Sequence, residues 1–274
     1  MLTVLITVII YALIIAYSLG AVLYFVGAKT EKRKLLHTAR TMAVTGCILN
    51  LLAIIVRTII AGRLPLANGC EFMLWFTWIT VLLYLIYETK SQVKDAGGVV
   101  MLIVAVLSII VAVLMRGQFG VATPLMPALK SPWLTVHVIT AAAAYAGFAL
   151  AAGLAVMQLI KADKRVSEES VYRVVAGGFV MLSLTIVLGA IWAEQAWGSY
   201  WTWDPKETWA LVTWLIYALY LHLQRRLKWK GKTASIMVVA GFILVLFTFF
   251  GVNYLLPGLH SYAGVWVAPV MITA

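Results

Sequence analysis

The sequence predicts an all-α polytopic membrane protein with about eight transmembrane helices and both termini on the outer, extracytoplasmic side. Of its 274 residues, 64% are hydrophobic and only 11% are charged, and the mean hydropathy is +0.99. Apolar runs of about 18 or more residues recur along the chain, as membrane helices require. Because these runs are long and continuous, they favour helices over the short alternating strands of a membrane barrel.

The first four predicted spans cover residues 2–27, 41–60, 71–87 and 98–115. The first has neither a leading basic segment nor a small-residue cleavage site, so we expect a retained helix and not a signal peptide. The second and third spans are joined by a loop that contains Arg63, Pro65 and Asn68.

The last four predicted spans cover residues 135–160, 174–193, 209–224 and 234–256. A loop with Pro124, Pro127 and Pro132 precedes the fifth span. That span is rich in small residues, from Ala141 to Gly153, which let another helix or a flat ligand approach closely. Helix packing alone explains them equally well. The loops on the basic side are short, so we expect a single integral membrane domain over residues 1–274.

Basic residues are unevenly divided between the predicted loops. The net charge is +11, and alternate loops hold most of the lysine and arginine residues: Lys29, Lys32, Arg33, Lys34 and Arg40, then Lys90 and Lys94, then Lys161, Lys164, Arg165 and Arg173, then Arg225, Arg226, Lys228, Lys230 and Lys232. The positive-inside rule places these loops in the cytoplasm and both termini outside. We therefore interpret the basic excess as a topology signal that meets anionic membrane lipid, and we expect no nucleic-acid partner.

Four of the 11 tryptophans lie within 13 residues of one predicted outer loop, and we call them the tryptophan cluster: Trp197, Trp201, Trp203 and Trp209. An ordinary membrane-edge belt needs only one or two aromatic rings per helix end. Here the rings alternate with charged residues, and we expect Asp204 and Glu207 to brace the loop or to cap the next helix. The pattern predicts a flat, rigid and water-poor aromatic platform, which suits a large planar ligand such as haem.

Two of the four histidines are predicted on the same outer face as the tryptophan cluster. His137 begins the fifth span and His260 follows the eighth. Imidazole is a standard axial ligand of haem iron, and two imidazoles can bind it from opposite sides. Either histidine alone would favour an interfacial residue bound to water or to a backbone carbonyl. Together with the tryptophan cluster they favour haem ligands.

The other two histidines lie toward the predicted cytoplasmic side. His222 is near the inner end of the seventh span, and Ala218, one turn earlier, leaves room beside its imidazole. A second, inner haem site is one interpretation of it. His37 lies in the basic segment 29–40, where it is either a solvated loop histidine or a residue that faces His222.

Arg57 and Glu71 are charged residues near the outer ends of the second and third spans. They either pair with each other or leave Arg57 to meet a carboxylate of haem. Cys47 and Cys70 are predicted too far apart for a disulfide. Because the chain has no C-x-x-C-H motif, any haem is not attached to it as in a c-type cytochrome.

The segment Trp197-Gly-x-x-Trp201-x-Trp203-Asp204-x-x-Glu207-Thr-Trp209 resembles the WWD signature of the haem-handling proteins of cytochrome c biogenesis. We call it the WWD loop, at about residues 194–209. The chain is similar to the CcsA (ResC) family of that superfamily from the second span on. The resemblance extends to Arg63-Leu-Pro65 with Asn68 and Glu71, Ser131-Pro-Trp-Leu-x-x-His137, Tyr220-Leu-His222 and Gly258-Leu-His260-Ser-Tyr262-Ala.

The resemblance implies a haem-handling subunit of a cytochrome c synthase (haem lyase), which carries non-covalent haem b to the outer membrane face. There the haem is presented for thioether attachment to apocytochromes with a C-x-x-C-H motif. It implies a ResB-like membrane partner and a multi-pass location in the bacterial inner membrane or the thylakoid membrane. The sequence shows no certain catalytic acid, base or nucleophile, which leaves positioning as the source of catalysis.

The resemblance also implies the residues of the site. His137 and His260 match outer haem ligands, and His222 matches a ligand for haem on its way out. The cofactor-binding residues of the signature are Trp197, Trp201, Trp203, Asp204 and Trp209. His37 has no clear counterpart.

Three alternatives remain open at this point. A haem-delivery protein of the CcmC type shares the signature but has fewer spans. A HemX-like regulatory membrane protein has a similar size but need not keep the tryptophan cluster. A b-haem or quinone electron-transfer subunit also uses histidine and tryptophan, but its loss would leave c-type cytochrome formation intact.

Overall fold

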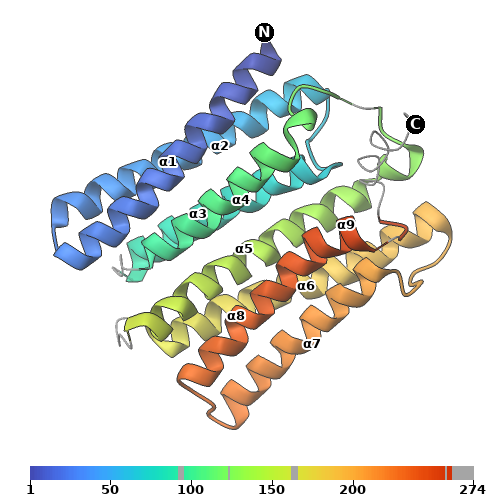
Figure 1. Ribbon diagram of the computed structural model, residues 1–274. Helices are drawn as coiled ribbons and strands as arrows, with labels where there is room; N and C mark the ends of the chain where they lie inside the picture. The colour runs from blue at the N-terminus through green and yellow to red at the C-terminus, as the bar shows by residue number, and fades with distance from the viewer. Residues whose placement is uncertain (92–95, 123, 162–165, 257, 261–274) are drawn as a thin grey trace, which may run out of the picture.

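The computed structural model describes residues 1–91, 96–122, 124–161, 166–256 and 258–260. All regular structure in these residues is helical, as predicted. Eight long helices lie side by side and alternate in direction (Figure 1). Their bounds are α1 Leu2–Thr30, α2 Arg33–Ala61, α3 Gly69–Ser91, α4 Gly97–Leu114, α5 Pro132–Lys161, α6 Glu168–Trp197, α7 Pro205–Arg226 and α8 Lys232–Leu246. Two short 3₁₀ turns, η1 Arg116–Gln118 and η2 Pro127–Leu129, lie between α4 and α5.

Seven of the described helical segments are long and apolar enough to cross a membrane, namely α1 to α6 and the segment Lys232–Leu255. The seventh predicted span corresponds to α7, which is less apolar because Lys206 and Glu207 lie in its first turns and Arg225 and Arg226 in its last. Its 22 residues still span about 33 Å. It packs against α6 and α8 and is antiparallel to both (Figure 1).

Several helices differ from the predicted spans. α2 begins at Arg33 instead of residue 41, because lysine and arginine are good helix formers and extend the helix beyond its apolar run. His37 is therefore an exposed helical residue, and the expectation of a loop histidine was wrong. The eighth span is interrupted, since a π turn, Phe247–Gly251 (η3), separates α8 from the short helix α9, Val252–Leu255.

The helix α5 lies at the centre of the bundle and packs against α3, α4, α6 and α8. Its small residues permit these contacts. A Cβ added at Gly147 would lie 3.2 Å from the Cα atom of Gly178 in α6, and one at Gly153 would lie 2.6 Å from the side chain of Val100 in α4. The small-residue stripe of α5 thus serves helix packing over most of its length.

The connections gather at two ends of the bundle (Figure 1). One end holds Met1, the α2–α3 connection, η1, η2 and the WWD loop, and we call it the outer end, following the predicted orientation. The opposite end holds the α1–α2 and α7–α8 connections, and we call it the inner end. Residues 261–274, which include Tyr262 and the C-terminus, lie outside the described residues, as do the predicted inner residues Lys94, Lys164 and Arg165.

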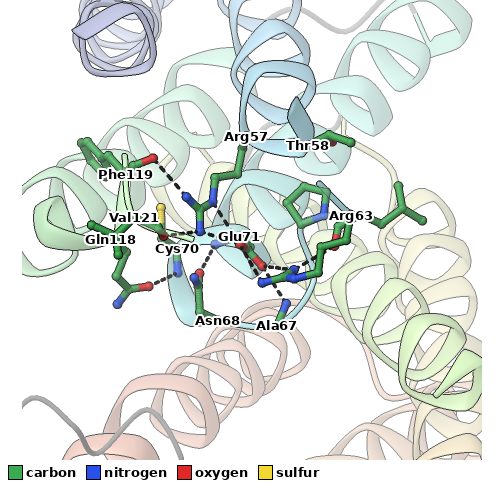
Figure 2. Close-up of polar contacts among 12 residues, drawn as sticks. Arg57, Thr58, Arg63, Ala67, Asn68, Cys70, Glu71, Gln118, Phe119 and Val121 are labelled. Carbon is green, nitrogen blue, oxygen red and sulfur yellow. Dashed lines mark hydrogen bonds and ion pairs between the residues drawn. The ribbon is translucent and has the colours of Figure 1, made fainter. Parts of the chain in front are cut away.

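A buried ion-pair network holds the outer loops together (Figure 2). Arg57 is fully buried and lies 2.8 Å from the Glu71 carboxylate. Of the two alternatives that the sequence left open for Arg57, pairing with Glu71 is the one that the structure shows. Arg57 also donates to the carbonyl oxygens of Phe119 and Val121, at 3.2 and 2.9 Å. The network therefore fixes the segment after α4 against the start of α3.

Candidate functional site

A cavity of about 620 Å³ opens among the helices at the outer end. Its wall is formed by α3, α5, α6, α7, the π turn and the outer loops. It runs inward as far as Tyr145 of α5 and Leu182 of α6. Three of the predicted site residues line it: His137, Trp201 and His260.

His137 is held in a fixed orientation in α5. Its Nδ1 atom lies 2.9 Å from the backbone carbonyl oxygen of Thr185 in α6. A carbonyl only accepts hydrogen bonds, so Nδ1 carries the proton and Nε2 keeps its lone pair. Gly189 makes room for the ring, since a Cβ there would lie 2.7 Å from the imidazole. The result is a neutral imidazole with one nitrogen available as a ligand.

His260 is oriented by the aspartate of the WWD signature. Its Nδ1 atom lies 3.2 Å from Oδ2 of Asp204, which again leaves Nε2 as the nitrogen available to a ligand. Asp204 is only 6% exposed. Burial by itself raises the pKa of the Asp204 carboxyl, but the hydrogen bond from His260 and nearby backbone N–H groups outweigh burial and lower the pKa below its ordinary value.

The chain begins α7 with a complete capping box, as expected for Asp204 and Glu207. Asp204 is the N-cap residue and accepts from backbone N–H groups of the first turn. Glu207 reaches back to the N–H groups of Thr202 and Asp204, at 2.8 and 3.3 Å. Glu207 is therefore occupied within the protein, and the cap fixes the Asp204 carboxylate, whose Oδ2 orients His260.

Trp192 of α6, which the sequence reasoning missed, contacts both histidines. It is 1% exposed, and its ring centroid lies 6.0 Å from that of His137 and 5.7 Å from that of His260. Its Nε1–H donates to the carbonyl oxygen of Ala128 in η2 at 2.9 Å. The two imidazoles thus pack against the same side chain, Trp192, which also connects the proline-rich loop to α6.

The tryptophan cluster does not form one flat surface. Trp201 lines the cavity, and its ring is perpendicular to that of Trp203, at 89°. Trp203 is 68% exposed and has a positive φ of 60°, which is uncommon for a residue with a side chain. Trp197 packs edge-on against His260, and Trp209 packs against Phe247 of the π turn. These are four different environments, and one of the four indoles lines the cavity.

The remaining histidines lie away from the cavity. His222 is exposed near the inner end of α7, and His37 is exposed in the first turns of α2. The two helices lie at opposite sides of the bundle in Figure 1, so the structure does not bring these histidines together.

Comparison with known families supports the resemblance of the WWD loop. The family model described as Cytochrome C assembly protein matches residues 66–260, from the loop before α3 to His260. The chain is 35% identical to a cytochrome c biogenesis protein CcsA from Chlamydomonas reinhardtii, over 81% of this chain and 67% of that protein. It is 30% identical to proteins of the same name from Guillardia theta, over 87% of this chain and 90% of that one, and from Prochlorococcus marinus (strain AS9601), over 91% and 89%.

A solved structure has the same arrangement of helices. The chain superposes on the cytochrome c haem lyase CcmF with a TM-score of 0.76, over 91% of this chain and 47% of that one, at 16% identity. At that identity the likeness shows a shared fold, and this chain spans about half the length of that protein. The matched signature, the matched family model and these relatives show that the chain belongs to the cytochrome c assembly protein family and is of the CcsA type.

Proposed function

We propose that this protein is the haem-handling subunit of a cytochrome c synthase. It receives non-covalent haem b and holds it in the outer cavity, where His137 and His260 supply the axial nitrogens. It presents the haem there to apocytochromes with a C-x-x-C-H motif. The observation that carries the proposal is that both histidines have Nδ1 fixed by a partner and lie beside one cavity.

The cavity fits such a ligand in size and in chemistry. Pockets for small molecules and cofactors measure about 300–1,000 Å³, and this one is about 620 Å³. The indole Nε1–H group of Trp201, which lines the cavity, is buried without a hydrogen-bond partner among the described residues. Because an unpaired buried donor is costly, this group favours a bound ligand or water in the cavity.

The chain contributes position and shielding to the proposed reaction. Bound haem supplies the vinyl groups that take up the two thiols of the apocytochrome. The two histidines would hold the haem iron, Trp201 would exclude water from the cavity wall, and Trp192 and the capping box keep His137 and His260 in place. Holding the reacting groups in one geometry is the main contribution that we assign to this protein.

The proposal includes a partner, a topology and a membrane. A ResB-like membrane protein completes the synthase, and the exposed His222 near the inner end of α7 binds haem on its way to the outer cavity. The outer end faces the periplasm or the thylakoid lumen, because the basic residues of the described inner connections follow the positive-inside rule. The membrane is the bacterial inner membrane or the thylakoid membrane.

The test is purification of the protein with and without a ResB-like partner, followed by an absorption spectrum of the bound pigment. We expect a spectrum of six-coordinate haem b that is extracted by acid-acetone, since the attachment is non-covalent. Co-expression with a C-x-x-C-H apocytochrome should yield covalent cytochrome only when both proteins are present. Purified protein with no haem in either form would contradict the proposal.

A further inference from the structure

Two cationic side chains line the same cavity as the two histidines and have no role in the site described so far. Arg63 comes from the loop between α2 and α3, and Lys206 comes from the first turn of α7. They approach the cavity from segments more than 140 residues apart in the chain. Their hydrogen bonds and ion pairs show whether they can bind an anionic group in the cavity.

Arg63 belongs to a network with more positive than negative charge (Figure 2). Glu71 is shared between two guanidinium groups, since Arg57 lies 2.8 Å from Oε1 and Arg63 lies 3.0 Å from Oε2. Oε2 also accepts from the N–H of Ala67 at 2.8 Å. One carboxylate therefore faces two guanidinium groups. Arg57 is enclosed by protein, whereas the side chain of Arg63 is 19% exposed and lines the cavity.

Arg63 also has hydrogen-bonding capacity left for a ligand. Among the described residues its NH1 group donates to the carbonyl oxygen of Leu64 and to Glu71, and its NH2 group makes a long contact of 3.4 Å with Glu71. A guanidinium group has five N–H donors in a planar fork, which matches the geometry of a carboxylate. Nε and the second NH2 hydrogen can therefore meet a carboxylate in the cavity.

Lys206 is a second cation at the cavity without a carboxylate bound to it. Its Nζ atom donates to Oδ1 of Asn253 at 2.9 Å and lies 5.9 Å from the ring centroid of Phe249. The two acids nearest in sequence form no ion pair with Nζ in the described part of the chain: Glu207 accepts from backbone N–H groups, and Asp204 accepts from His260 through Oδ2, while its Oδ1 meets no donor. An ammonium group has three donors, and one is used by Asn253 in the described part of the chain.

The two cations converge on one part of the wall. Phe249, which lies below Lys206, stacks on Phe72 of α3 with ring centroids 4.8 Å apart. A Cβ built at Gly69, the first residue of α3, would lie 3.8 Å from Phe249. Phe249 thus links Lys206 to the first turn of α3, where Glu71 forms an ion pair with Arg63. Both cations therefore face the cavity from the side where α3 and α7 begin.

We infer that Arg63 and Lys206 bind the two carboxylate groups of the haem in the outer cavity, and this rests on the proposed function. Haem b is a dicarboxylate whose two propionates lie on one edge of the macrocycle and whose vinyl groups lie on the other half. Two axial nitrogens leave the ring free to rotate about the line that joins them. Two carboxylates held at the start of α3 and α7 stop this rotation and direct the vinyl groups away from that wall.

The experiment compares haem with haem dimethyl ester, in which both carboxylates are neutral and the rest of the ring is unchanged. Each is titrated into the purified haem-free complex in detergent, and the dissociation constant is read from the absorption band of the bound form. We expect the wild type to bind haem at least about tenfold more tightly than the ester, since charged hydrogen bonds are the strong ones. Lys206→Gln and Arg63→Gln should each lower the affinity for haem and leave the affinity for the ester unchanged.

Three variants complete the test. Lys206→Arg should retain the preference for haem, because it keeps the charge. Lys130→Gln removes an exposed charge of the same end that does not line the cavity, so it should behave as wild type. The double variant Arg63→Gln with Lys206→Gln should bind the two forms equally. Thermal unfolding of each variant shows whether the fold survives, and Lys206→Gln leaves the Arg57–Glu71 pair intact.

The outcomes separate the two proposals. A wild type that binds neither form would overturn the proposed haem site itself. A wild type that binds both forms equally, or variants that weaken both forms alike, would overturn the carboxylate contacts while the haem site stands.

Discussion

One ion pair at the outer end of the bundle and one at the inner end differ in burial. At the outer end Arg57, fully buried, pairs with Glu71, and Asp204 caps a helix while it orients His260. At the inner end Arg173 and Glu169 pair on the surface of α6, with side chains 76% and 55% exposed. The Arg57–Glu71 pair and Asp204 are enclosed by protein, whereas the Arg173–Glu169 pair stays in water.

The histidines divide in the same way. His137 and His260 each have one ring nitrogen fixed by a protein oxygen. His222 and His37 are exposed, and no described residue hydrogen-bonds to their rings. Preorganised imidazoles suit a site that must hold its ligand in one orientation, and an exposed imidazole suits contact with something outside this chain. The predictions below test this division.

The largest expected contrast is in the exposure of the two ends to opposite sides of the membrane. Lys130→Cys in the outer connection and Lys230→Cys in the inner connection are both exposed positions. A membrane-impermeant maleimide added from the outside should label Lys130→Cys and leave Lys230→Cys unlabelled until the membrane is permeabilised. The native Cys47 and Cys70 are buried, so background labelling should be low. The reverse pattern would place the candidate site on the cytoplasmic side.

Replacing either outer histidine should nearly abolish haem binding at the cavity. Loss of a residue that only orients a metal ligand costs about 10- to 100-fold in affinity, and His137→Ala or His260→Ala removes the ligand itself. Haem content by pyridine haemochrome and the yield of covalent cytochrome c should both fall. Added imidazole should partly restore them, because it fits the space of the missing ring. His37→Ala is the matched control and should mature cytochrome c normally; normal maturation in both outer variants would make these residues interfacial histidines only.

The tryptophans should differ among themselves, although the signature treats them alike. Trp201→Ala removes an indole that lines the cavity and should lower haem affinity about tenfold. Trp203→Ala removes a ring that is 68% exposed and should lower it less. Imidazole should restore neither, because it replaces a nitrogen ligand and not a wall. Equal losses in the two variants, measured by the same titration, would show that the WWD loop acts as one rigid unit.

The sequence predicts the helices and part of the site for physical reasons that are local. Apolar runs determine the spans, and Asp204 three residues before Glu207 predicts the helix cap that forms. Trp192 was missed because a lone tryptophan at a helix end is typical of the membrane edge. Its role depends on Ala128, 64 residues away, and on two histidines from other segments. The angle between Trp201 and Trp203 depends likewise on the backbone of the folded loop.

The ion pairs of the two ends should differ in their effect on stability. Glu71→Gln leaves Arg57 charged and buried without its carboxylate, and such a loss costs about 3–5 kcal/mol in the free energy of unfolding. Glu169→Gln breaks an exposed pair one helical turn apart and should cost at most about 0.5 kcal/mol. Thermal or denaturant unfolding in detergent measures both. Similar costs for the two variants would mean that water reaches the outer network in the membrane-bound protein.

The smallest expected effect on the outer cavity is that of His222→Ala. The residue lies near the inner end of α7 and does not line the cavity, so the affinity of the purified complex for added haem should change by less than about twofold. Maturation of cytochrome c in cells should nevertheless fall, because the proposed role of His222 is supply from the inner end. Imidazole should restore maturation, since the lesion is one missing nitrogen ligand. If His222→Ala lowers the affinity of the outer cavity as much as His137→Ala does, the two ends are one coupled site. If imidazole restores Trp201→Ala as well as His222→Ala, it acts by some route other than filling a ligand position.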